Sequence, residues 1–222
     1  MDINEEIKVI KTELRLSMNG VVSQSMREKG LSYRLNFGLL LPQIKQIAAK
    51  HTPNHDLAQA LWKTDIRECM LMAGMLQPIE TFYPEIATIW MDAIPYVEVA
   101  EVLCMTLFQK LPYASEKAFE WIAEDRFYYQ LCGFLVLNRL FLRGDILNER
   151  SANEFLDHAI ANLPTSEIQL RRVVATAIKN FAQQSPAQAQ QVKELLLLKK
   201  ESFSDDVQSY IEGIVEVSDS FD

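Results

Sequence analysis

The chain has 222 residues, of which 49% are hydrophobic and 23% charged, and these fractions are ordinary for a globular protein. Seven glycines and eight prolines are too few for a fold rich in tight turns, so the composition favours long helices over a sandwich or barrel of strands. No apolar run approaches the ~20 residues of a membrane-spanning helix, and the acidic start gives no sign of a secretory signal.

The net charge of −8 comes mostly from the end of the chain. From residue 201 onward there are seven acidic residues and no Lys or Arg, whereas residues 1–200 carry 22 positive and 23 negative side chains. DNA-binding proteins usually show a basic excess, because neutralising phosphates supplies much of their affinity. The average composition therefore argues against strong non-specific DNA binding, although a local basic face remains compatible with it.

The sequence predicts no cofactor and no metal. It has no glycine-rich phosphate loop and no motif of a zinc protease or serine hydrolase. His51 and His55 are four residues apart, but Pro53 lies between them and no carboxylate or Cys is suitably placed beyond Asp56, so we expect a solvated loop there. Cys69, Cys104 and Cys132 form no Cys-x-x-Cys pair and lie in apolar segments, which is typical of buried free thiols in a reducing cytoplasm.

Helical periodicity starts at the N-terminus. Apolar residues at helical spacing predict helices over residues 3–18 and 21–29, and Gly30 is a natural end for the second. Residues 31–40 read as an irregular connector, after which Pro42 suits the first turn of a helix reaching residue 50. Residues 54–77 then predict two short amphipathic helices joined by a break of about three residues.

The second half of the chain continues the same pattern. The 126–143 segment is apolar on all sides, so it should be the innermost helix, and Asn148 and Ser204 are plausible N-caps of later helices. The predicted segments are 79–94 (interrupted near Pro84), 96–110, 115–124, 126–143, 148–162, 168–184, 186–199 and 204–217.

These elements predict an all-α fold. Apolar segments beginning at residues 66, 127 and 170 resemble one another, each as the second member of a helix pair, and they fit units of about 40 residues. We therefore expect one domain over residues 1–222, a superhelical array of antiparallel helix pairs of the HEAT-like or ARM type, ending in an acidic helix. The concave face of such a stack is the usual binding surface.

The central helix pair carries a family resemblance. Leu57-Ala58, Leu61-Trp62, Glu68 and Leu71-Met72-Ala73 resemble the pattern of the DNA alkylation repair family, the AlkD-like HEAT-repeat glycosylases. Trp62 and Glu68 are structural landmarks of that pattern. The resemblance implies the helical-repeat fold and, with it, a groove for double-stranded DNA.

The resemblance also implies catalytic positions, and this chain departs from most of them. A glycosylase stabilises a cationic sugar with a carboxylate, stacks aromatic rings on the lesion and holds a phosphate with Arg. The acid falls on Glu101, the only one of these groups that keeps its charge. The stacking positions fall on Val97 and Thr176, and the Arg position on Leu131, with Gln130 beside it.

A second alignment frame offers Trp90 and Asp92 in place of Val97 and Glu101, with a different spacing. We expect Trp62, Trp90 and Trp121 to pack in the core, because each lies at helical spacing with apolar partners. The candidate site is therefore Glu101 as the catalytic acid, against a simple solvated carboxylate, with DNA-binding residues Arg126, Tyr128, Arg172 and Lys179.

Two functions compete. The chain is a DNA alkylation repair-like protein that binds alkylated DNA in a groove, with base excision not expected, or it is a helical-repeat scaffold for a protein or peptide. A small-molecule enzyme has no motif behind it. A basic stripe would favour DNA, and its members would be Lys45, Lys63, Arg67, Arg126, Arg172 and Lys179.

Overall fold

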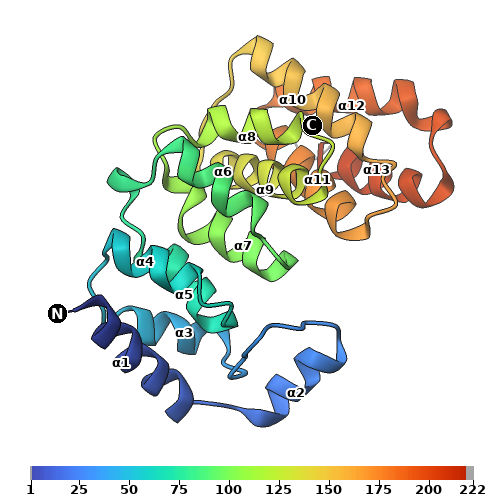
Figure 1. Ribbon diagram of the computed structural model, residues 1–222. Helices are drawn as coiled ribbons and strands as arrows, with labels where there is room; N and C mark the ends of the chain where they lie inside the picture. The colour runs from blue at the N-terminus through green and yellow to red at the C-terminus, as the bar shows by residue number, and fades with distance from the viewer. Residues whose placement is uncertain (1, 219–222) are drawn as a thin grey trace. The chain divides into compact units, whose positions relative to one another are not determined.

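The computed structural model describes residues 2–218, and every regular element among them is helical (Figure 1). The one β-type pairing there is an isolated bridge between Leu35 and Ile66. The α-helices are α1 (Ile3–Leu16), α2 (Gly20–Glu28), α3 (Leu41–Ala48), α4 (His55–Trp62), α5 (Arg67–Leu76), α6 (Pro84–Asp92), α7 (Val97–Thr106), α8 (Ala114–Ile122), α9 (Phe127–Arg143), α10 (Glu149–Asn162), α11 (Ile168–Ala182), α12 (Pro186–Lys199) and α13 (Asp205–Ser218). The all-α prediction is confirmed.

Several helices begin where a side chain accepts one of the first backbone N–H groups. Asn54 accepts from the N–H of Leu57 at 2.9 Å, and Asn148 accepts from the N–H of Ser151 at 2.9 Å. The predicted interruption of the 79–94 segment near Pro84 is present, since a short 3₁₀ turn (Ile79–Thr81) precedes α6, whereas the predicted 96–110 helix ends at Thr106 and is followed by a 3₁₀ turn (Phe108–Lys110). Pro84 starts α6, where its missing N–H costs nothing.

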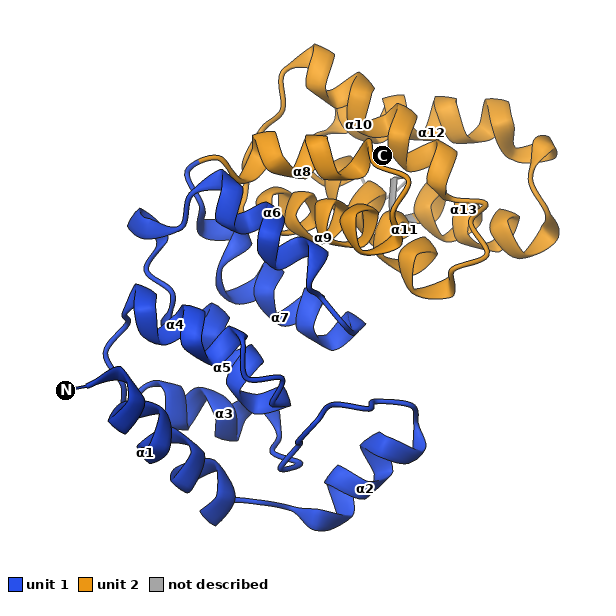
Figure 2. Ribbon diagram, in the orientation of Figure 1, with its two compact units in different colours: residues 1–112 blue, residues 113–222 orange. Residues whose placement is uncertain are grey.

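The chain divides into two compact units, Met1–Pro112 and Tyr113–Asp222 (Figure 2). In the first unit α4 and α5 form a pair, and α5 also packs against α3 and α7. In the second, α8 pairs with α9, and α11 packs against α9, α10, α12 and α13. Paired helices are therefore the building block of both units, while a single domain over residues 1–222 stays a prediction.

The second unit is built around α9, as its apolar sequence predicts. Ten of its residues are buried, including Leu131 and Phe134 with no exposed surface. Gly133 allows α8 to approach closely, because a Cβ there would lie 2.6 Å from Ile122 Cγ2 and 2.8 Å from the carbonyl oxygen of Ala118. The helix ends at Gly144, whose φ of 88° is left-handed.

The three tryptophans pack in the core, as predicted. Trp90 is fully buried, stacks on Trp62 with ring centroids 4.5 Å apart, and donates its Nε1–H to Gln59 at 3.1 Å. Trp121 is 2% exposed. Trp90 therefore is not available to stack on a base, and the second alignment frame loses its aromatic group.

The cysteines are free and buried, also as predicted. Burial raises the pKa of the Cys69 thiol to about 11, so it is not a thiolate at neutral pH. Among residues 2–218 no helix is both long enough and apolar enough to cross a membrane.

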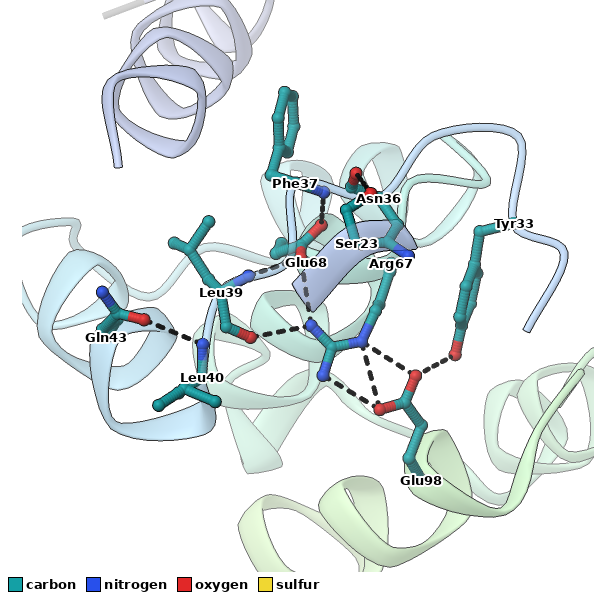
Figure 3. Close-up of polar contacts among 10 residues, drawn as sticks. All are labelled: Ser23, Tyr33, Asn36, Phe37, Leu39, Leu40, Gln43, Arg67, Glu68 and Glu98. Atoms are coloured by element: carbon teal, nitrogen blue, oxygen red, sulfur yellow. Dashed lines mark hydrogen bonds and ion pairs between the residues drawn. The ribbon is translucent and has the colours of Figure 1, made fainter. Parts of the chain in front are cut away.

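The connector between α2 and α3 is fastened to the helices by its own backbone. The fully buried Glu68 carboxylate accepts the N–H of Phe37 at 3.0 Å and of Leu39 at 3.2 Å (Figure 3). Between them Gly38 has a φ of 74°, and a Cβ there would lie 2.2 Å from the carbonyl oxygen of Asn19. Only glycine allows this turn.

Arg67 joins Glu68 to α7. Its Nη1 donates to Glu68 at 3.0 Å and to the Leu39 carbonyl at 2.9 Å, while Nε and Nη2 each reach the Glu98 carboxylate at 2.9 Å. The Tyr33 hydroxyl donates to the same carboxylate at 2.7 Å (Figure 3). The buried polar groups of α5 are thus paired with the connector and with α7.

The electrostatics of this cluster follow from burial and pairing. Burial alone would lower the pKa of Arg67, but its hydrogen bonds to Glu98 and the nearby carboxylates raise it overall, so the guanidinium stays charged. Burial, and then the hydrogen bond to Glu98, raise the pKa of Tyr33 above its usual value, so the phenol stays protonated.

We predict that Glu68→Ala lowers the unfolding free energy by about 3–5 kcal/mol, the usual cost of breaking a buried charge pair from one side. The substitution leaves two backbone N–H groups without their acceptor and removes one of the two acceptors of the Arg67 Nη1. Denaturant unfolding measures this change in the unfolding free energy. Exposed Glu80→Ala in the same unit should stay within about 0.5 kcal/mol of wild type, and equal effects of both changes would contradict this role.

Candidate nucleic-acid interface

The predicted basic stripe does not form in the first unit. Arg67 is 5% exposed and fully engaged with Glu68 and Glu98, so its assignment to a DNA-contacting stripe is wrong. Lys45 lies on α3, with its Nζ 3.9 Å from the Met105 sulfur of α7, and Lys63 is the C-cap of α4. The continuity that the stripe required is broken at α5.

Glu101 lies on the exposed side of α7. It is solvent-exposed, and its neighbours one turn away, Val97 and Met105, are half-buried. The three share one face of the helix because they are four residues apart. That face presents a carboxylate between two aliphatic side chains, and it carries no aromatic ring.

Arg126 and Tyr128 lie together at the start of α9. The Arg126 guanidinium sits 3.6 Å from the centroid of the Tyr129 ring and 3.4 Å from the Glu124 carboxylate. Tyr129 is buried, while Tyr128 is half-buried and contacts Phe127 with ring centroids 5.1 Å apart. Arg126 is thus held flat on an aromatic face, with about half of its side chain (53%) still exposed.

Arg172 and Lys179 lie on one face of α11. They are seven residues apart, two helical turns, with Thr176 between them. Arg172 is exposed and Lys179 half-buried, and among the described residues neither has an ion pair with a carboxylate. Gly213 of α13 leaves room for Lys179, whose Nζ would lie 3.4 Å from a Cβ at that position.

Contacts between α9 and α11 place Arg172 at the same end of the second unit as Arg126 and Tyr128, whereas Lys179 lies two turns away, in the last turn of α11. Asn180 donates to Asn138, and Gln184 donates to the Asp145 carbonyl at 2.8 Å, so the helices run in the same direction. Arg172 is eight residues before Asn180, and Gln130 is eight before Asn138. Arg172 therefore lies level with the first turn of α9, where Tyr128 is.

The neighbouring Arg171 has a different role from Arg172. Its guanidinium donates to the Thr165 carbonyl at 2.6 Å and to Asp206, and it lies 5.9 Å from the Tyr210 ring centroid. The hydroxyl of Ser204, and after it Arg171, lower the pKa of Asp206. Arg171 thus fastens α13 to α11, and it is not available to a ligand.

The acidic end of the chain is partly neutralised within the second unit. Besides the Arg171–Asp206 pair, Lys200 contacts Glu212 at 2.8 Å. Both acids belong to α13, which packs beside α11. Their negative charge is therefore offset locally and opposes an anion near Arg172 less than the sequence count suggests. Asp219 and Asp222 lie outside the described residues.

The side chains at the remaining catalytic positions cannot replace those that the family resemblance implies. Leu131 has no exposed surface, so the phosphate-binding Arg is replaced by a core residue. Thr176 donates its hydroxyl to the Arg172 carbonyl at 2.7 Å, which uses its polar group within the helix. Neither these residues nor Val97 offers a ring to stack on a cationic base.

The loop between His51 and His55 is solvated, as expected, since Thr52, Pro53 and Asn54 are exposed, but the His51 side chain itself is buried. The His51 side chain is 6% exposed, 3.1 Å from Glu6 and 3.6 Å from Glu13 of α1. His55 is instead near Gln77, at 3.2 Å. Among residues 2–218 no three His, Cys, Asp or Glu residues are grouped as a metal site.

The comparisons with known proteins give a family and a fold. The family described as DNA alkylation repair enzyme matches residues 10–193. A solved structure, titled as a new family of proteins related to the HEAT-like repeat DNA glycosylases with affinity for branched DNA structures, aligns with a TM-score of 0.71. The alignment covers 82% of this chain and 81% of that one, at 18% identity. No curated protein matches the chain. The likeness establishes the HEAT-like repeat fold.

We predict that Arg171 and Arg172 contribute differently to the stability of the protein, as measured by thermal denaturation. Arg171→Ala should lower the unfolding free energy by about 1–3 kcal/mol, because it removes charged hydrogen bonds at the α11–α13 contact. Arg172→Ala is the matched control and should change it by less than about 0.5 kcal/mol, because that side chain is exposed. A larger loss for Arg172→Ala would contradict its assignment as a surface cation.

Proposed function

Because the chain belongs to the DNA alkylation repair enzyme family, we propose that it binds double-stranded DNA and does not excise bases from it. The contact surface that we propose is the exposed face of α11 with the start of α9, defined by Arg126, Tyr128, Arg172 and Lys179. We further propose that both units work as one domain, since the family match runs through both.

The observation that most supports DNA binding is the pair of cations on α11. Arg172 and Lys179 face the same side, and among the described residues neither is neutralised by a carboxylate. Cations without an ion-pair partner gain the most free energy from binding a phosphate, because binding releases counterions without first breaking an ion pair. Tyr128 and Arg126 extend the surface with an aromatic ring and a third positive charge.

The absence of excision is proposed from the chemistry of the catalytic positions. A carboxylate stabilises a developing sugar cation best in a site from which water is excluded, and Glu101 is exposed. An exposed charge acts through water, which weakens its field. Leu131 and Thr176 supply neither the phosphate clamp nor the ring that the resemblance implies, so Glu101 stands without the groups that would position a substrate.

Whether the protein prefers branched or duplex DNA is a separate question from base excision. The structural relative is described as having affinity for branched DNA, and a DNA junction is therefore a substrate to compare with duplex. Binding through phosphates positions a protein without reading sequence, so we expect sequence preference to be weak for either substrate.

A peptide-binding scaffold remains a second candidate, and one pocket favours it. At the C-terminal ends of α9 and α11 lies a pocket of about 390 Å³ lined by Phe141, Leu142, Ile146 and Asn180. Leu142 is 67% and Ile146 82% exposed. Exposed apolar side chains beside a polar rim are typical of a surface that contacts another protein.

The test is DNA binding at low and at moderate salt, with duplex and four-way junction DNA. We expect salt-sensitive binding, and we expect Arg172→Ala/Lys179→Ala to weaken it at least tenfold and to reduce the slope of log K against log salt by about 2, since each lost phosphate contact removes about 0.9.

The matched control removes two other exposed cations of the second unit, Arg150 of α10 and Lys199 of α12. Arg150→Ala/Lys199→Ala lowers the net charge equally and should leave affinity within about twofold, as expected for cations remote from the bound phosphates. If both double variants weaken binding alike, the α11 surface is not the contact. If the wild-type protein binds no DNA even at low salt, the proposal of DNA binding fails and the peptide-binding scaffold becomes the favoured function.

A further inference from the structure

A second pocket lies in the first unit, between α1 and the connector, apart from the proposed α11 surface. Its volume is about 520 Å³, within the range of pockets that hold small ligands. One wall comes from α1 and the residues just after it, with Lys11, Arg15 and Met18, and the other from consecutive connector residues, Leu35, Asn36 and Phe37.

The α1 wall is cationic. Lys11 and Arg15 are four residues apart, so they lie on one face of α1, which ends at Leu16 shortly before Met18. Among the described residues neither Lys11 nor Arg15 has an ion pair, whereas Lys8 of the same helix contacts Glu5 at 2.7 Å. Two adjacent unpaired cations over a pocket fit an anion, and a phosphate is the common one.

The connector wall is rigid. The carbonyl of Leu35 accepts the N–H of Arg67 at 3.0 Å, that of Asn36 accepts the Ser23 hydroxyl at 2.8 Å, and that of Phe37 accepts the N–H of Asn19 at 2.8 Å. Glu68 holds the N–H of Phe37 from the other side (Figure 3). The backbone of this wall is therefore fixed before any ligand arrives, which lowers the entropic cost of binding.

Asn36 carries the clearest sign of a ligand. Its Nδ2 and Oδ1 are both buried, and neither has a hydrogen-bond partner among the described residues. Buried amides are rarely left unpaired, because each unpaired group costs free energy. A turn of the side chain toward the pocket would offer one donor and one acceptor side by side, the arrangement with which Asn pairs with the edge of a base.

We propose that this pocket binds a deoxynucleotide, with its phosphate on Lys11 and Arg15, its base against Leu35 and Met18, and the base edge on Asn36. Leu35 is 43% and Met18 56% exposed, so both present apolar surface to a ring. A free nucleotide and an unpaired nucleotide of a DNA strand share this chemistry. Binding of an unpaired nucleotide of a DNA strand rests on the proposed DNA binding, whereas binding of a free nucleotide does not.

The test follows the Met18 methyl group by NMR in full-length protein labelled with methyl-¹³C methionine, its signal identified by its loss in Met18→Leu. We expect deoxyadenosine monophosphate to shift it saturably, and inorganic phosphate or deoxyadenosine alone to bind at least tenfold more weakly. Lys11→Gln/Arg15→Gln should weaken nucleotide binding at least tenfold. Arg27→Gln/Lys29→Gln, with the same charge loss outside the pocket, should not.

A blunt duplex and the same duplex with an unpaired overhang distinguish the sources. A Met18 shift with the overhang but not the blunt end places the nucleotide in a DNA strand, and a shift with the mononucleotide alone assigns a free nucleotide. The pocket is overturned if neither the mononucleotide nor the overhang shifts the Met18 signal, or if both double variants weaken binding alike. A Met18 shift without any duplex binding would contradict the proposed function and leave the pocket standing.

Discussion

The first unit depends on a charge cluster that is almost entirely removed from water. Arg67 is 5% exposed and Glu68 fully buried, yet the hydrogen bonds of both are made within the protein, to Glu98, to the connector backbone and to each other. Such a cluster is costly to desolvate, and it stabilises a fold only when its geometry is complete. It therefore fixes where the connector and α7 lie against α5.

The positions of two candidate surfaces depend on this charge cluster. Phe37, whose N–H Glu68 accepts, lines the proposed nucleotide pocket. Glu98, which Arg67 holds, lies one turn before Glu101 on α7. In the second unit the comparable role belongs to Arg171, which joins α11 to α13. Arginines of this chain thus fall into those that build the fold and those left for a ligand, and only the second kind supports a proposal of DNA binding.

The sequence predicted the helices well because their signals are local. Apolar periodicity, the caps at Asn54 and Asn148 and the apolar run of α9 depend on neighbours a few residues away, and they locate the elements within a few residues. Trp62 and Glu68 were recognised as structural for the same reason, since the family pattern is itself a packing pattern.

The sequence did not predict which charges are used internally. Arg67 meets Glu98, and His51 meets Glu6 and Glu13, across separations that no helical period reveals. Arg171 and Arg172 are adjacent and chemically identical, and only the position of α13 separates their roles. The pocket at Lys11 and Arg15 was missed because its other wall is an irregular connector whose path depends on Glu68.

The central claim is that this member of the DNA alkylation repair family binds DNA without excising bases. The most direct measurement places the protein with a methylated duplex and follows, in one experiment, the bound fraction and the release of methylated purines. We predict salt-sensitive binding with no release above the spontaneous rate. Release that greatly exceeds this rate, and that Glu101→Gln abolishes while binding persists, would contradict the account and make Glu101 a catalytic residue.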